Sequence, residues 1–119
     1  MTLKLNTRVI DGIIVVDCHG RIIFGEESSM LREAIKEQLK ISKQIVINLG
    51  DVNYIDSGGL GTLVGLFTSA RSQGGSIKLA NLTHRVGELL QVTKLLTVFD
   101  VYDGEDKAVR SFSKKGAVA

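Results

Sequence analysis

Leu-Gly-Asp-Val-Asn-Tyr-Ile-Asp-Ser-Gly-Gly-Leu-Gly, residues 49–61, separates two segments with different hydrophobic patterns. The β-branched run at 44–49 before it is typical of a buried strand. After it, apolar residues recur at steps of three and four, which predicts a helix over about 58–73. The residues of this apolar stripe are Leu60, Leu63, Val64, Phe67 and Ala70. The stretch therefore predicts a strand, a polar loop at 50–59 and a helix.

Asp56 and Ser57 stand at the predicted start of that helix, and both are favoured N-cap residues. A hydroxyl there faces unpaired backbone N–H groups and the positive end of the helix dipole, where a phosphate is well tolerated. A phosphoryl group on Ser57 would add close to two negative charges, which Asp51 and Asp56 would oppose. Such a change alters the charge of the loop without altering the fold. The alternative is that Ser57 is a plain helix cap.

Glycines open the same helix at Gly58, Gly59 and Gly61. Each costs about 1 kcal/mol relative to alanine in a helix interior, so their presence indicates close approach of another group. That group is either the sheet or a binding partner, and the sequence leaves both open. Thr62 and Gly65 lie off the apolar stripe, so we expect them on the exposed face of the helix.

The rest of the chain alternates strands and helices. Asp11-Gly12 is a strong hairpin signal, and Gly20 is expected to end the second strand. The predicted segments are strands at 3–10, 13–19, 44–49 and 76–80, a short strand or extended connection at 21–24, and a last short strand or extended segment at 95–102. Helices are predicted from Glu26, at 58–73, after Asn81 or Thr83 and at 105–113, and a loose tail at 114–119.

This order predicts one α/β domain over residues 1–119, with its core at about 3–113. We expect a mixed sheet of four to five strands packed with about four helices. Right-handed crossovers place the strand-to-helix loops at one edge of the sheet, where binding sites usually lie. Residues 50–59 are expected at that edge.

Composition excludes several classes of function. A net charge of +2 gives no electrostatic footprint for nucleic acid or a membrane surface. The single cysteine, Cys18, cannot form an internal disulfide and fits a reducing compartment. The start of the chain has no signal-peptide pattern and no apolar run reaches 18 residues. We therefore expect a cytoplasmic protein.

Two kinds of site are disfavoured by spacing. Cys18 and His19 are adjacent in a predicted strand and point to opposite faces, so we expect no metal site. The glycines at 58–61 fit neither nucleotide-binding glycine motif, so we expect no cofactor.

Asp-Ser-Gly-Gly also occurs around the nucleophile of trypsin-like serine proteases. Those enzymes need an all-β scaffold about twice as long as this chain. The only candidate bases are His19 and His84, and nothing in the sequence brings either to Ser57. Ile55 also breaks the Gly-x-Ser-x-Gly pattern of hydrolases. We therefore predict that the protein is not an enzyme.

The sequence resembles the STAS-domain family of anti-sigma factor antagonists. The resemblance covers roughly residues 9–103 and is carried by residues 51–57, Gly59-Leu60-Gly61, residues 73–79 and the Leu89–Leu95 region. Family members bind a serine kinase that also acts as an anti-sigma factor, and so release a sigma factor. Phosphorylation of a serine makes them let go, and a PP2C-type phosphatase resets them. The resemblance implies that Ser57 is the phosphoacceptor and Asp56 the preceding acidic residue.

Two positions depart from the family pattern. Gly58 stands where the family usually has serine or threonine. Residues 20–23 read Gly-Arg-Ile-Ile where the family usually has Gly-Glu-Leu/Ile-Asp near its partner surface. The charge reversal at Arg21 implies either a kinase with a matching acidic patch or a different signalling assembly.

We therefore predict a phosphorylation-controlled switch that binds an anti-sigma factor kinase and so regulates transcription. The alternative is an unphosphorylated scaffold or a sensory module that binds a small ligand. The identity of the kinase and any self-association are left open. The predicted partner-binding residues are Arg21, Asp56, Ser57, Gly58, Gly59, Gly61, Thr62 and Gly65.

Overall fold

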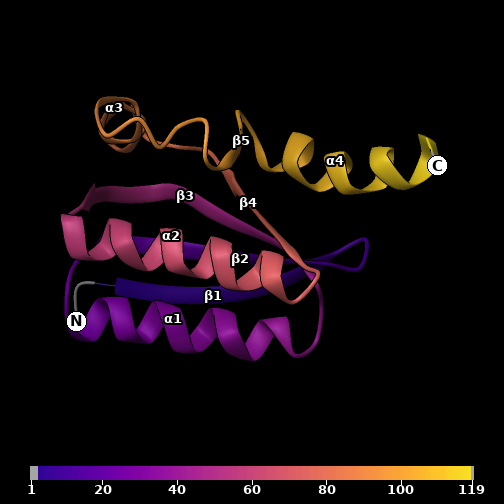
Figure 1. The fold of residues 1–119 in the computed structure, drawn as a ribbon, viewed down its shortest axis with the longest axis horizontal. Helices are drawn as coiled ribbons and strands as arrows, with labels where there is room; N and C mark the ends of the chain where they lie inside the picture. The colour runs from indigo at the N-terminus through magenta and orange to yellow at the C-terminus, as the bar shows by residue number, and fades with distance from the viewer. Residues whose placement is uncertain (1–2, 119) are drawn as a thin grey trace.

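The computed structural model describes residues 3–118, with side chains described for residues 3–112. Strands and helices alternate after an initial hairpin (Figure 1). The elements are β1 (Leu3–Ile10), β2 (Ile13–Ile22), α1 (Glu26–Leu39), β3 (Gln44–Ile55), α2 (Ser57–Ser72), β4 (Ser76–Ala80), α3 (His84–Val92), β5 (Asp100–Tyr102) and α4 (Glu105–Val118).

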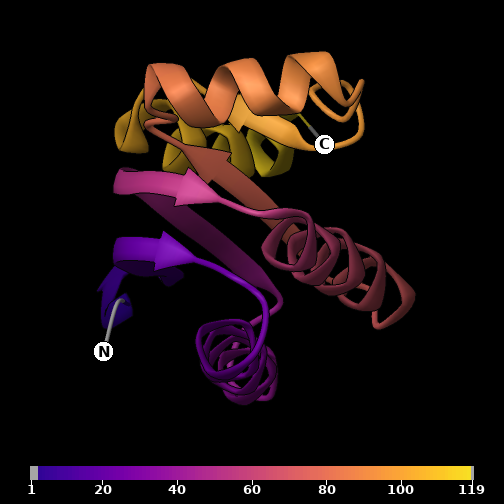
Figure 2. The same ribbon diagram turned by 90° about the vertical axis from the view of Figure 1, so that its left-hand side faces the viewer.

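The described strands form one sheet in the order β1-β2-β3-β4-β5. β1 is antiparallel to β2, and the remaining neighbours are parallel. Helices α1 and α2 lie side by side on one face, while α4 covers the opposite face (Figures 1 and 2). The predicted α/β class with a mixed sheet is confirmed, with five strands and four helices in the part of the chain described.

The β1–β2 connection is a tight turn at Asp11 and Gly12. Their φ angles are 52° and 79°, so both residues have positive φ, as a two-residue type I′ hairpin requires. The hairpin predicted from Asp11-Gly12 is confirmed. It sets β1 antiparallel to β2 with Ile10 opposite Ile13.

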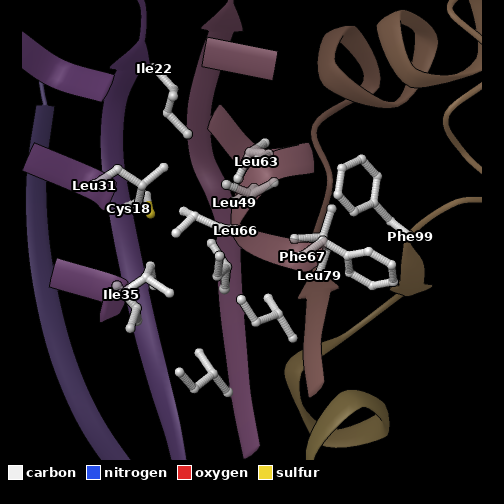
Figure 3. Packing of buried hydrophobic residues seen from close by; sticks show 14 of the residues in the cluster. Cys18, Ile22, Leu31, Ile35, Leu49, Leu63, Leu66, Phe67, Leu79 and Phe99 are labelled. Atoms are coloured by element: carbon white, nitrogen blue, oxygen red, sulfur yellow. The ribbon is translucent and has the colours of Figure 1, made fainter. Parts of the chain in front are cut away.

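The main core lies between the sheet and the α1–α2 layer (Figure 3). Buried side chains from β2, β3 and β4 meet those of the two helices, and α3 adds Val86 and Leu90. The predicted stripe of α2 is buried at four of its five positions, and Val64 is partly buried. A smaller cluster under α4 contains Ala108, Val109 and Phe112.

β2 and β3 are both longer than the sequence predicted. Gly20 does not end β2, because pairing with β3 continues to Ile22, with irregular register on both sides of His19 and Gly20. The predicted loop at 50–59 is therefore wrong for residues 50–55, which continue β3. Val52 and Ile55 are buried in the core, and their burial holds this extension on the sheet.

The C-terminal third differs in part from the prediction, which gave a short strand or an extended segment at 95–102. Within 95–102 only Asp100–Tyr102 forms a strand, because the residues after α3 turn back on it; Leu95 N–H, for example, donates to the Leu90 carbonyl. The predicted loose tail at 114–119 is wrong for residues 114–118, which extend α4. Residue 119 lies outside the described residues.

Candidate functional site

Asp56 caps α2 and ties it to the segment between β2 and α1. Its Oδ1 accepts a 2.7 Å hydrogen bond from the N–H of Gly59, and its two oxygens accept from the N–H of Phe24 at 3.1 and 3.0 Å. These bonds, that from Gly59 first, hold the pKa of the Asp56 carboxyl below its usual range. Asp56 is therefore an ionised anchor that fixes the geometry of the site.

Ser57 is the first residue of α2, and its side chain is exposed. Asp56 is the N-cap, so the alternative in which Ser57 serves as a plain cap is wrong. Among the residues that the structure describes, none hydrogen-bonds to the Ser57 hydroxyl. That oxygen is free to react, at the positive end of a 16-residue helix.

The glycines of α2 divide into two groups. A Cβ on Gly59 would lie 2.0 Å from the Ile22 carbonyl oxygen, and one on Gly58 would lie 2.5 Å from the Phe24 Cβ. These two glycines allow α2 to approach the end of β2 and the segment after it. Among the described residues, a Cβ on Gly61 or Gly65 would meet nothing within 4 Å, so these two leave the helix surface open.

Thr62 is buried, with 8% of its surface exposed, so the expectation that it lies on the exposed face is wrong. The cause is α1, which packs beside α2 on that side. The Thr62 hydroxyl donates to the Gly58 carbonyl at 3.1 Å and accepts a 3.5 Å hydrogen bond from Arg32 of α1.

A groove of about 700 Å³ runs between α1 and α2, which lie side by side in Figures 1 and 2. Ser57 lines it, as do four other residues of the predicted partner-binding set. The lining residues are Phe24, Gly25, Ser28, Ser29, Arg32, Lys36, Ser57, Gly58, Gly61, Thr62, Gly65, Leu66 and Ser69.

Arg21, Asp56 and Gly59 do not line the groove. Arg21 is exposed on β2, opposite Tyr54 of β3. Gly59 is buried under Ile22, and Asp56 supports the groove only through the backbone it holds. The structure thus brings Ser57, Gly58, Gly61, Thr62 and Gly65 together and leaves the other three outside.

The contribution of α1 to this groove was not predicted from the sequence. Phe24, Arg32 and Lys36 form its second wall with Ser28 and Ser29. Ser28, Arg32 and Lys36 recur at steps of four; Ser28 is buried, and Arg32 and Lys36 follow it beside the buried Leu31 and Ile35. This polar stripe is the signal that could have identified them.

The histidines and the cysteine are engaged elsewhere. His19 Nδ1 lies 2.7 Å from Asp51 Oδ2, and His84 Nε2 lies 3.2 Å from Glu88 Oε2. Cys18 is buried, and burial raises the pKa of its thiol to about 12, which leaves the thiol inert near neutral pH. Among the described residues, no three His, Cys, Asp or Glu side chains form a metal-binding group.

Comparison with known proteins gives the family. Residues 4–108 match the model of the STAS domain. An anti-sigma-B factor antagonist of Bacillus subtilis (strain 168) is 34% identical over 101 residues, which are 85% of this chain and 92% of that protein. The chain therefore belongs to the STAS-domain family and, within it, to the anti-sigma factor antagonists.

Solved structures agree on the fold. A crystal structure of an anti-sigma factor antagonist from Mycobacterium paratuberculosis has a TM-score of 0.79 at 22% identity, covering 92% of each chain. The antagonist SpoIIAA of Bacillus in its unphosphorylated form has a TM-score of 0.76 at 17% identity, covering 93% of this chain and 97% of that one. SpoIIAA is also solved in a phosphorylated form, with a TM-score of 0.67 at 18% identity, covering 92% of this chain and 98% of that one.

Anti-sigma factor antagonists are regulators that act by binding anti-sigma factors rather than by catalysis. In the part of the chain that the structure describes, no helix combines the length and apolar character needed to cross a membrane.

Proposed function

We propose that this protein is a switch that binds a serine kinase acting as an anti-sigma factor, and that phosphorylation of Ser57 ends the binding. While bound, it keeps the kinase from its sigma factor and so permits transcription. The observation that carries the proposal is the Ser57 hydroxyl, which is exposed, unbonded by any described residue and placed at the start of α2.

The geometry at Ser57 supports an effect of phosphorylation through charge alone. It would lie next to the ionised Asp56, and the helix dipole and the open N–H groups of the first turn would stabilise it. The fold need not change, because Asp56 and its hydrogen bonds to Phe24 and Gly59 hold the backbone. What changes is the charge that the partner meets.

The partner-binding surface comprises Ser57, Gly58, Gly61, Thr62 and Gly65 in the groove. Asp56 and Gly59 act by holding the backbone, and Arg21 is an outlying contact on β2. Unphosphorylated protein binds the kinase, and a PP2C-type phosphatase removes the phosphate. The chain itself performs no catalysis and acts in the cytoplasm, where sigma factors meet RNA polymerase.

The direct test is mass spectrometry after incubation with ATP and each anti-sigma factor kinase encoded in the same genome. We expect one added phosphoryl group, mapped to Ser57 and absent from Ser57→Ala. The matched control is Ser72→Ala, which removes an exposed serine at the other end of α2 and leaves the modification intact. Failure of every kinase to modify the wild-type chain would contradict the switch and favour an unmodified scaffold.

A further inference from the structure

The two walls of the α1–α2 groove differ in charge. Arg32 and Lys36 on α1 are the charged residues among those that line it, and both are cationic. The α2 wall consists of glycines, hydroxyl side chains and Leu66. The groove therefore has a basic side although the chain as a whole carries a net charge of only +2.

Arg32 is half-buried, and in the described part of the chain its guanidinium has one hydrogen-bond partner, the Thr62 hydroxyl, at a long 3.5 Å. Arg8 shows the contrast, because its guanidinium bonds the carboxylates of Asp17 and Glu105. A partly buried guanidinium has five N–H donors that favour a carboxylate or phosphate. Neither Arg32 nor Lys36 has a carboxylate within ion-pair distance among the described side chains.

The end of the groove at Phe24 and the α2 wall are both suited to binding a protein segment. Phe24, at the start of the α1 wall, is 79% exposed and offers an aromatic ring of the kind that anchors interfaces. Gly61 and Gly65 present no side chain and no neighbour within 4 Å of a Cβ, so a partner backbone can approach α2 closely.

We propose that the α1–α2 groove receives an acidic segment of the anti-sigma factor kinase, with a carboxylate against Arg32 and Lys36 and an apolar side chain against Phe24. This inference rests on the proposed function and names the chemistry of its partner. Charge complementarity determines the occupant, because the described residues that line the groove include two cations and no acid.

The same groove explains why a phosphate on Ser57 would release the kinase. Ser57 and Arg32 both line it, and the Arg32–Thr62–Gly58 hydrogen bonds link Arg32 to the first turn of α2. A phosphoryl group on Ser57 would repel the partner's carboxylate and compete with it for the two cations.

The role of the positive charge in the groove is tested with two matched charge-reversal variants on α1. Lys36→Glu reverses a cation in the groove, whereas Lys40→Glu reverses one just past the end of the same helix, outside the groove and beside Glu37. Affinity for the kinase that modifies Ser57 is measured by calorimetry. We expect Lys36→Glu and Arg32→Gln to weaken binding at least tenfold, and Lys40→Glu to change it less than twofold.

The requirement for an open groove is tested with a second pair of variants, each replacing a glycine by leucine. Gly65→Leu fills the groove, and Gly87→Leu makes the same change on α3, where a Cβ meets only Leu82 Cβ at 4.0 Å. Circular dichroism checks that both variants fold. We expect Gly65→Leu to lose at least tenfold in kinase affinity while Gly87→Leu retains it.

Two outcomes separate this inference from the switch itself. If Lys36→Glu and Gly65→Leu bind the kinase as the wild type does, while Ser57→Asp does not, the groove proposal is overturned and the switch stands. If no kinase binds the wild-type chain, both are overturned.

Discussion

Asp56 and Phe24 are joined by a three-centre hydrogen bond, in which the backbone N–H of Phe24 donates to both carboxylate oxygens of Asp56, at 3.1 and 3.0 Å. The same carboxylate caps α2 through the N–H of Gly59. One side chain thus positions both the start of α2, where Ser57 stands, and the first residue of the opposite groove wall. Because the site depends on this contact, its loss has measurable consequences.

Replacing Asp56 by alanine removes the cap and the tie to Phe24 together. We expect Asp56→Ala to lower the free energy of unfolding by about 1–2 kcal/mol, the usual cost of losing an N-cap. Urea unfolding measures the effect. Glu33→Ala, at an exposed position of α1, is the control and should stay within about 0.5 kcal/mol of the wild type. Equal stability of the two variants would contradict the anchoring role of Asp56.

The contribution of Asp56 depends on pH with a defined sign. Hydrogen bonds from Gly59 and Phe24 lower its pKa in the folded state, so ionised Asp56 favours folding. The stabilisation is present above the unfolded pKa, about 3.9, and is lost as pH falls through the folded value. Melting curves of wild type and Asp56→Asn should differ most near pH 7 and converge below pH 4. A gap that widens in acid would contradict this assignment.

Gly59 and Gly61 lie two residues apart in one helix and should respond oppositely to alanine. A Cβ on Gly59 would lie 2.0 Å from the Ile22 carbonyl oxygen, so Gly59→Ala should destabilise the fold by about 1–3 kcal/mol or more. Gly61→Ala meets nothing within 4 Å and should stabilise α2 by up to about 1 kcal/mol. Thermal unfolding distinguishes them, and a similar shift in both would refute the close approach of α2 to β2.

Gly58 stands where the STAS family usually has serine or threonine, and in this chain the difference has a steric cause. Phe24 occupies the space that a side chain at position 58 would need, with its Cβ 2.5 Å and its Cδ1 2.9 Å from a Cβ built there. We expect Gly58→Ala to cost about 1–3 kcal/mol in the wild-type background. The cost should fall by at least about 1 kcal/mol in the Phe24→Gly background. A double-mutant cycle measures this coupling, and strict additivity would show that the two residues do not share the space.

The sequence predicted most elements because local signals and tertiary packing agree in them. Asp11-Gly12 can adopt the two positive φ angles of its turn, and the stripe of α2 matches the face that packs on the sheet. The prediction failed at residues 50–55 because Gly50, Asp51 and Asn53 have the composition of a loop. There the pairing of β3 with β2 overrides local preference.

The site was predicted on α2 and missed on α1 for a related reason. Helical periodicity identifies which side of α2 faces the sheet, but it does not show that α1 covers a second side. Thr62 is buried for this reason, and Arg32 and Lys36 enter the groove for the same reason. Such contacts depend on the packing of two helices that are separate in sequence.

Kinase affinity as a function of the charge at position 57 tests the central claim most directly. Calorimetry would compare wild type, Ser57→Ala, Ser57→Asp and protein phosphorylated on Ser57. We predict that Ser57→Ala binds within about twofold of the wild type, whereas Ser57→Asp and the phosphorylated protein bind at least tenfold more weakly, a loss of about 1.4 kcal/mol or more. Equal affinity of all four forms would contradict the claim that charge at the start of α2 releases the partner.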